Sequence, residues 1–334
     1  MFKVKVGIIG SGNSALTFVK ALNYRKEFDL VAIGSRNQRK AKQIAKIYKK
    51  NVLILSIQEV IESKDINLII ICLPGFIQRK IICDSFKNNK NVICEKPMSI
   101  KLIDAKLIYD NWKKYKKIGI VNFCYNFIEE FKIFKKILKK NKFKFHTIYI
   151  SWLFTNSKNF HKNKWKKFME NGGGALYNFA SHILNFLFPT GDKFKILSVN
   201  QFHNKKNKKY FDNFFHLLIK KRLIYNINIS SVVSPNFGIK FLATGEKGSV
   251  IMENFKSKSP AGSFKIISLK QETNSIKSRI VRKGKYNINL TQLYLRTLDY
   301  FLSIKKSKKE KYPLSIKEGY ENIKLINQIR KFHK

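Results

Sequence analysis

The sequence predicts an α/β protein of two domains. A doubly wound parallel sheet comes first, followed by an α+β domain with a largely antiparallel, open sheet. Three observations support this prediction. The chain has 334 residues, which is more than one compact core usually serves. Short apolar strands alternate with amphipathic helices up to about residue 122, and strand-like segments follow one another after it. We therefore expect domains at residues 1–122 and 123–334, with the last helices able to pack back on the first domain.

The alternation in the first domain is typical of a parallel sheet with helices on both sides. Leu68–Leu73 is a continuous apolar run, as expected for a strand buried on both faces. Ala41, Ile44 and Tyr48 follow helical spacing. The expected strands are 3–9, 30–34, 68–73, 91–94 and 118–123, and the expected helices are 14–24, 40–49, 81–88 and 103–115.

The second domain reads differently, because its strand-like segments are joined by short polar connections. Such succession favours antiparallel pairing. The expected strands are 147–153, 195–201, 214–219, 223–229, 240–243, 249–252 and 264–269. The expected helices are 129–140, a glycine turn and helix at 171–188, and two near the end at 290–304 and 315–330.

The charge balance is unusual, with 67 Lys and Arg against 21 Asp and Glu and a formal net charge of +46. Such a charge attracts phosphates and nucleic acids. A nucleic-acid footprint would gather on one face or one tail, whereas basic clusters occur along the whole chain. We interpret the charge as compositional bias and expect no specific nucleic-acid partner. A basic nucleic-acid-associated protein is our third hypothesis.

Other features of the sequence concern location and metals. No apolar run approaches the roughly 20 residues of a membrane span, and the first residues do not resemble a secretory signal. The four cysteines form no CxxC pair, which disfavours a zinc knuckle or a disulfide framework. We expect a cytoplasmic protein with no membrane association and no metal.

A dinucleotide fingerprint follows the first expected strand. Gly10-Ser11-Gly12-Asn13-Ser14-Ala15 has the form G-x-G-x-x-A and opens a helix. In this context the first glycine permits a tight turn, the second lets the backbone approach a pyrophosphate, and the small third residue keeps helix and strand close. The free N–H groups of the helix start suit an anion. We therefore predict a Rossmann domain that binds a nicotinamide dinucleotide through these six residues.

The end of the second strand bears on the choice of dinucleotide. A site that prefers NAD usually has an acid there for the ribose 2′-hydroxyl. This chain has Ser35 and Arg36 instead, and Asp29 lies at the wrong end of the strand. Ser35 and Arg36 suit a 2′-phosphate, which favours NADP. NAD stays open as the alternative, because a hydroxyl can also bond a ribose.

Two further motifs make the chain resemble the Gfo/Idh/MocA family of nicotinamide-dependent oxidoreductases. Cys94-Glu95-Lys96-Pro97 is similar to the family's E-K-P signature, and residues 172–182 resemble its G-G-G-x-x-x-D-x-G-x-H stretch. Leu73-Pro74 matches a T-P that follows the fourth strand. The resemblance implies catalytic roles for Lys96 and His182. It also implies dinucleotide contacts at Leu73, Pro74, Glu95 and Lys96, and substrate contacts at Asn178 and His182.

Physical chemistry gives the implied residues plausible tasks. Lys96 follows a parallel strand, and open α/β sheets bind their ligands at that edge. Its ammonium group suits a substrate hydroxyl and proton transfer, and Glu95 would orient it. The imidazole of His182 is matched to neutral pH as a proton donor or acceptor. Trp152, His161, Lys164 and Trp165 precede the glycine turn, where members of the family often place substrate contacts. Aromatic faces suit sugar rings, but packing in the core is the commoner role of a Trp side chain.

The sequence also departs from the family pattern. Asn178 stands where an Asp is usual, and an amide cannot accept a proton. Asn185 replaces another Asp, and Asn126 replaces the arginine of an N-Y-R-F-like segment. The polar N-x-x-H after the fourth strand reads Gly75-Phe76-Ile77-Gln78. These changes weaken the expected catalytic pair more than the dinucleotide site.

These observations predict an NAD(P)-dependent oxidoreductase acting on CH–OH groups. Hydride would pass between the nicotinamide and a hydroxyl or carbonyl of a sugar or sugar derivative. A phosphorylated or nucleotide-linked sugar would suit the basic surface. We expect a homodimer or homotetramer supported by the open sheet. The main alternative is a non-catalytic protein that binds or senses a dinucleotide.

Overall fold

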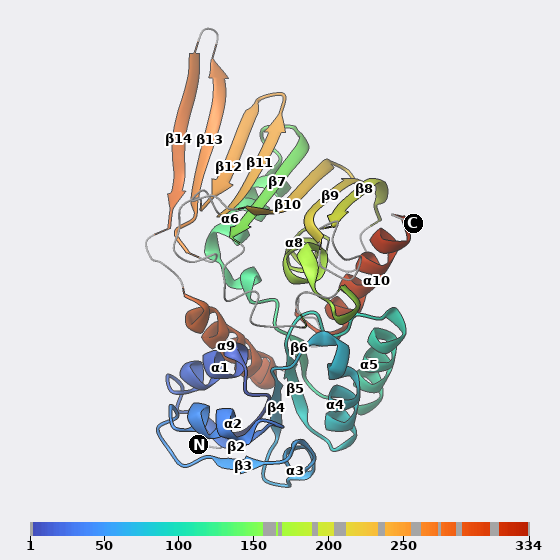
Figure 1. The fold of residues 1–334 in the computed structure, drawn as a ribbon. Helices are drawn as coiled ribbons and strands as arrows, with labels where there is room; N and C mark the ends of the chain where they lie inside the picture. Colours follow the sequence, from blue (N-terminus) through green and yellow to red (C-terminus); the bar gives the residue numbers. More distant parts are fainter. Residues whose placement is uncertain are drawn as a thin grey trace. The chain divides into compact units, whose positions relative to one another are not determined.

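The computed structural model describes residues 3–155, 165, 169–188, 193–203, 212–232, 238–254, 262–272, 275–284, 289–307 and 314–332. The chain divides into two compact units (Figure 1). The first contains residues 1–124 and 290–325, and the second contains residues 125–289 and 326–334.

The first unit is built on a six-stranded sheet in the order β3-β2-β1-β4-β5-β6. Every neighbouring pair is parallel. This is the doubly wound order, and it confirms the predicted Rossmann fold. The strands are β1 (Val4–Ile9), β2 (Phe28–Gly34), β3 (Leu53–Leu55), β4 (Leu68–Ile71), β5 (Asn91–Cys94) and β6 (Gly119–Val121).

Helices accompany this sheet as the alternating pattern predicts. They are α1 (Asn13–Leu22), α2 (Gln38–Ala45), α3 (Ile57–Glu62), α4 (Gly75–Lys87) and α5 (Leu102–Tyr115). All four residues of β4 are buried, because apolar residues on both of its faces meet helices. Helix α3 begins with a capping box, in which Ser56 and Glu59 bond each other's backbone N–H groups.

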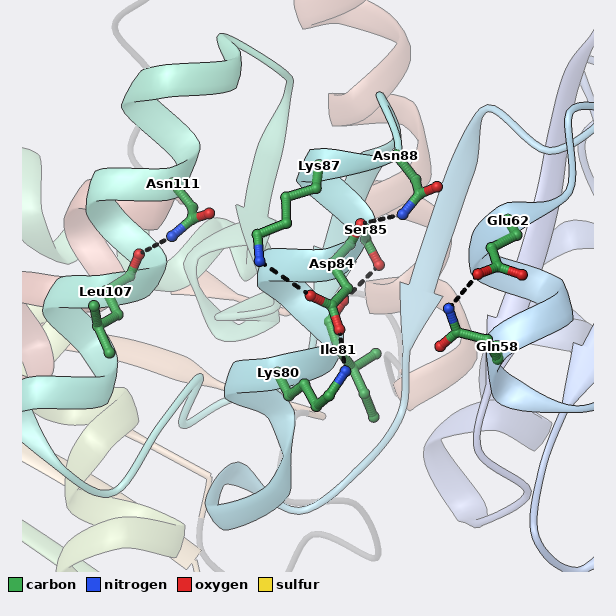
Figure 2. A network of polar contacts seen from close by, with 10 residues as sticks. All are labelled: Gln58, Glu62, Lys80, Ile81, Asp84, Ser85, Lys87, Asn88, Leu107 and Asn111. Carbon is green, nitrogen blue, oxygen red and sulfur yellow. Dashed lines mark hydrogen bonds and ion pairs between the residues drawn. The ribbon is translucent and has the colours of Figure 1, made fainter.

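Helix α4 shows how part of the excess charge is neutralised locally. Asp84 forms ion pairs with Lys80 and Lys87 on the same helix (Figure 2). Pairs of this spacing add a few tenths of a kcal/mol to an exposed helix. These basic side chains lie on the surface of a helix, which agrees with compositional bias as the origin of the net charge.

Two helices near the end of the chain contribute to the first unit. Helix α9 (Leu290–Ser307) packs on α1, where the rings of Phe18 and Tyr294 lie 4.5 Å apart between centroids. Arg25 forms an ion pair with Asp299 at 2.6 Å. Helix α10 (Ile316–Phe332) follows, and its residues up to 325 belong to the same unit. Among the residues that the structure describes, no helix combines the length and apolar character of a membrane span.

The second unit contains an eight-stranded sheet in the order β14-β13-β12-β11-β7-β10-β9-β8. Only β7 and β10 pair in parallel, so the sheet is largely antiparallel, as predicted. The strands are β7 (Phe145–Thr155), β8 (Lys195–His203), β9 (Asp212–Lys220), β10 (Ile224–Val232), β11 (Gly238–Gly245), β12 (Gly248–Glu253), β13 (Lys265–Glu272) and β14 (Ser275–Lys283).

Aromatic side chains form the core on one face of this sheet. Phe131 of α6 (Glu129–Lys140) contacts Phe241 of β11, and Phe186 of α8 (Ser181–Leu187) contacts both rings. Phe131 and Phe264 meet edge to face at 5.1 Å. Two short helical turns, η1 (Cys124–Phe127) and η4 (Leu176–Ala180), precede α6 and α8.

The opposite face of the sheet carries an uncharged row of side chains. The strand registers place its seven members side by side across β9 to β14, in the order Leu218, Asn226, Tyr149, Leu242, Ile251, Ile267 and Ile280. Tyr149 is 45% exposed and Ile280 is 64% exposed. We refer to these seven residues as the open-face row.

Candidate dinucleotide and catalytic site

The fingerprint loop lies at the carboxyl edge of the six-stranded sheet, between β1 and α1. Gly10 has a φ of +114°, which only glycine adopts without strain. A Cβ at this position would lie 2.5 Å from the carbonyl oxygen of Cys72, at the end of β4. Gly10 is therefore required both for the turn and for the close approach of the neighbouring strand.

The N-terminus of α1 fits the phosphates of a dinucleotide. Gly12 is the N-cap of α1 and has no side chain that could accept a hydrogen bond from the N–H groups of the first turn. That turn contains no acidic residue. A Cβ on Gly12 would meet no atom within 4 Å, so the backbone is open on that side. The first N–H groups of a helix lack partners within it, and these suit an anion.

The end of β2 lies beside this loop. The hydroxyl oxygens of Ser11 and Ser35 are 2.8 Å apart, and Ser35 also accepts a hydrogen bond from the Asn37 N–H. Arg36 is exposed next to them. Asp29 pairs with Lys5 in the sheet register, at the opposite end of β2, and forms an ion pair with Lys50. Ser35 and Arg36 are thus the side chains available next to the fingerprint at the end of β2.

The E-K-P segment follows β5 and is held by the first turn of α4. Gln78 is fully buried, and its Nε2 donates to the carbonyl oxygens of Glu95 and Pro97, each at 3.0 Å. A Cβ on Gly75 would lie 2.6 Å from the Pro97 carbonyl oxygen. The peptide bond between Lys96 and Pro97 is cis. Gln78 thus fixes the backbone on both sides of Lys96, which is itself partly exposed.

The carboxylate of Glu95 is buried and accepts two hydrogen bonds at Oε1. Asn122, just after β6, donates its Nδ2 at 3.0 Å, and Tyr294 of α9 donates its hydroxyl at 2.8 Å. The Thr297 hydroxyl donates to Asn122 Oδ1 at 2.8 Å and so orients that amide. A buried charge is tolerated when such donors satisfy it.

Three buried thiols surround this carboxylate. Burial raises the pKa of the Cys72, Cys94 and Cys124 thiols, and the negative charge of Glu95 raises it further. The positive charge of Lys96 acts in the opposite direction on Cys124. A raised pKa keeps these thiols protonated at neutral pH, which disfavours their use as nucleophiles. The described residues contain no cluster of candidate metal ligands.

The other expected catalytic residue, His182, belongs to the second unit. It lies in α8, directly after the π-helical turn η4, and its ring stacks on Tyr125 at 4.4 Å between centroids. Trp152 lies beside both rings and is only 3% exposed, so its packing role is confirmed. The imidazole is therefore held by aromatic packing against a buried platform. His161 and Lys164 lie outside the described residues.

The amides that replace charged residues of the family pattern have partners of their own. Asn178 Nδ2 donates to the Gly174 carbonyl at 3.0 Å, within the glycine turn. Asn126 Nδ2 donates to Asn185 Oδ1 at 2.7 Å. Asn126 stands where the resemblance expects an arginine and Asn185 where it expects an Asp. The two departures therefore meet in one neutral hydrogen bond.

The structure places the predicted dinucleotide residues together at one edge of the first unit, around the ends of β1, β2, β4 and β5. Asn178 and His182 lie in the second unit. Sequence reasoning missed Gln78 as a support for Lys96, and Asn122 and Tyr294 as partners of Glu95. Gln78 follows Pro74 by four residues and so stands at the last position of the expected N-x-x-H segment, and this position was the available signal. Nothing in the sequence marks Tyr294.

Comparison with known protein families agrees with this geometry. Residues 4–123 match the oxidoreductase family with an NAD-binding Rossmann fold, and residues 141–333 match the C-terminal α/β domain of the same family. The chain belongs to the Gfo/Idh/MocA oxidoreductase family. This confirms the resemblance, and it makes the protein an oxidoreductase of the NAD(P)-dependent class.

Relatives of this Gfo/Idh/MocA protein include oxidoreductases of several organisms. An uncharacterised oxidoreductase of Synechocystis is 24% identical over 276 residues, which are 78% of this chain and 74% of that protein. Glucose-6-phosphate 3-dehydrogenase of Bacillus subtilis is 27% identical over 138 residues, which are 41% of this chain and 39% of the enzyme.

Solved structures share the whole fold. A levoglucosan dehydrogenase in complex with NADH and L-sorbose has a TM-score of 0.83 at 16% identity, covering 100% of this chain and 97% of the other. A 3-ketoreductase from Actinomadura kijaniata in complex with NADP and TDP-benzene has a TM-score of 0.81 at 14% identity, covering 99% and 98%. At these identities the likeness shows the fold.

We predict that Cys83 of α4 reacts slowly at neutral pH. Burial raises its pKa to about 11. At pH 8 only about 0.1% of such a thiol is ionised, and the rate should rise about tenfold per pH unit up to pH 11. Because the pKa of Cys83 is raised in the folded state, its protonated thiol adds to the free energy of unfolding below the ordinary thiol pKa, and this contribution is lost as the pH rises toward 11. Alkylation with iodoacetamide, followed by peptide mass spectrometry, measures the rate; urea-unfolded protein is the control. Rapid labelling of native Cys83 at pH 8 would contradict the assignment.

Proposed function

We propose that this oxidoreductase transfers a hydride between a nicotinamide dinucleotide and a CH–OH or carbonyl carbon of a sugar or sugar derivative. One observation carries the proposal. The Lys96 segment is fixed on both sides by Gln78, at the same sheet edge as an open, acid-free fingerprint helix. An ammonium group on a backbone segment that is held in this way, beside a dinucleotide site, suits proton transfer to or from a substrate oxygen. The sugar dehydrogenases among the relatives support the substrate class.

The residues of this chain would divide the work as follows. Gly10 and Gly12 admit the pyrophosphate to the N-terminus of α1, with the remaining fingerprint residues, Leu73 and Pro74 around it. When bound, the dinucleotide supplies or accepts the hydride. In the oxidative direction, the substrate hydroxyl loses its proton to Lys96 or His182 while its carbon loses the hydride. In the reductive direction the same residues return the proton to the carbonyl oxygen.

The neutral amides bear on which sugar is accepted. Asn178 and Asn185 contribute no negative charge where the family often carries carboxylates, and Asn126 contributes no positive charge where an arginine is expected. Two negative charges and one positive charge are thus absent, which on a chain of net charge +46 favours an anionic substrate, such as a phosphorylated or nucleotide-linked sugar.

A non-catalytic dinucleotide-binding protein is the second candidate. The observation that favours it is the bond from Asn178 to Gly174, because this amide neither accepts a proton nor carries a charge toward His182. Saturable dinucleotide binding without turnover of any sugar would support this candidate.

We predict that Arg36 distinguishes NADPH from NADH. Arg36→Ala should raise the Kd of NADPH about 10- to 100-fold, the usual loss for a bond to a charged group, and should leave the Kd of NADH within about twofold. Fluorescence titrations at low salt and at about 150 mM salt measure both constants. Arg39→Ala, a change at an exposed arginine in the next helix, is the matched control. Equal losses for both dinucleotides would withdraw the NADP preference.

We predict that Lys96 carries the proton transfer. Lys96→Ala should lower kcat at saturating NADPH by about 10² to 10⁴, the usual contribution of general acid–base catalysis. Turnover is measured with a panel that includes glucose 6-phosphate, myo-inositol and levoglucosan. Lys101→Ala, at the exposed residue before α5, is the control. Unchanged turnover in Lys96→Ala would exclude the assigned role.

We further propose that a second copy of the chain covers the open-face row. Like copies of a chain with a net charge of +46 repel each other, so a contact between copies is favoured where charge is absent. The seven residues of the row carry no charge, six of them are apolar or aromatic, and Tyr149 and Ile280 are exposed, as at a protein contact.

We predict that Ile251→Asp reduces the protein to a monomer, because it places two buried carboxylates in the contact. Multi-angle light scattering after gel filtration measures the mass, with wild type expected as a dimer or tetramer. Ile103→Asp, at a 64% exposed residue of α5, should leave the mass unchanged. A monomeric wild type at micromolar concentration would overturn this proposal.

A further inference from the structure

Tyr294 connects two parts of the dinucleotide unit that are far apart in sequence. It lies on α9, 199 residues after Glu95, and is 7% exposed. Its ring packs on Phe18 of α1, the helix that the fingerprint opens. The packing fixes the ring, so the position of the hydroxyl group is determined by the helices rather than by a flexible side chain.

The hydroxyl group of Tyr294 is held by Glu95. It donates to Glu95 Oε1 at 2.8 Å. Burial raises the pKa of Tyr294 well above its usual value, and the charge of Glu95 raises it further. The phenol therefore keeps its proton for Glu95.

Helix α9 also controls the second donor to Glu95. Thr297 lies three residues after Tyr294, on the same face of the helix, and orients Asn122 toward the carboxylate. One helix thus supplies both supports of Glu95, directly through Tyr294 and indirectly through Thr297. A shift of α1 against α9 would change the hydrogen bonds of Glu95, whose neighbour in the chain is Lys96.

We infer that Tyr294 is a positioning residue that couples the fingerprint helix to the Glu95–Lys96 segment. Phe18 belongs to α1, whose first N–H groups would receive the dinucleotide phosphates. Because the ring of Tyr294 packs on Phe18 and its hydroxyl group donates to Glu95, the position of α1 is transmitted to Glu95. This inference rests on the proposed dinucleotide site and adds a residue that links binding to the placement of the lysine.

A double-mutant cycle tests the link without substrate or dinucleotide. Phe18→Leu and Glu95→Gln are combined in wild type and in Tyr294→Phe, and the equilibrium constant of urea unfolding is measured for each variant. Phenylalanine keeps the ring that packs on Phe18. In wild type the two changes should be non-additive by at least about fivefold, and in Tyr294→Phe they should be additive. Additivity in wild type, or non-additivity that survives in Tyr294→Phe, would overturn the inference.

Dinucleotide affinity provides the second measurement. Tyr294→Phe should weaken binding of the preferred dinucleotide, NADPH or NADH, about tenfold in a fluorescence titration. Tyr48→Phe is the matched control, because its hydroxyl group is also buried and hydrogen-bonded, at the opposite end of β2. A merely structural tyrosine would lower stability in both variants and leave both affinities unchanged, and that result would also overturn the inference.

The two measurements separate this inference from the proposed function. If wild type binds neither dinucleotide but the cycle shows the expected coupling, the link through Tyr294 stands and the proposed function fails. If wild type binds a dinucleotide but the cycle is additive, the proposed function stands and the inference fails.

Discussion

The buried carboxylate of Glu95 is the constraint on which the arrangement of the first unit depends. A charge removed from water must be matched by donors, and here the donors are Asn122, just after β6, and Tyr294 of α9. The carboxyl ends of β5 and β6 and the returning helix are therefore held at one point. The position of the neighbouring Lys96 follows from this requirement and from the two hydrogen bonds that the Gln78 side chain donates to backbone carbonyl oxygens.

The same requirement explains why the chain must return to its first domain after building the second. Helix α9 belongs to the first unit although more than 160 residues separate it from β6. Its apolar face packs on α1, and Tyr294 and Thr297 supply the polar contacts within that packing. Packing and polar satisfaction thus reinforce each other, as they must where a buried polar network is to fix one structure.

The second unit is stabilised by a different principle. Its sheet is covered on one face by aromatic rings of α6 and α8, and its other face keeps a row of uncharged side chains open. The ring of His182 is part of the aromatic packing through Tyr125 and Trp152. Packing of this kind orients the imidazole in a chain whose motif carries Asn178 in place of an acid.

The sequence by itself determined the fold class and most elements. Local patterns suffice for this: the apolar run of β4 and the glycines of the fingerprint act over a few residues. The expected helix at 129–140 agrees with α6. Strands β3 and β14 and helix α3 were missed. Strand β3 has three residues, one of them exposed Leu53, and the few apolar residues of β14 are interspersed with Lys, Arg and Ser at an exposed edge. The capping box of α3 is a readable signal in the sequence, because Glu59 follows Ser56 by three residues.

Only the tertiary structure decided which side chains support Lys96. Tyr294 meets Glu95 across 199 residues, Asn126 meets Asn185 across 59, and Gln78 reaches two carbonyl oxygens beyond the next strand. Such pairs have no local pattern, because long-range packing brings them together and each partner alone resembles an ordinary polar residue. The sequence marks residues whose backbone needs are local, whereas a buried charge is satisfied by whichever donors the completed fold places beside it.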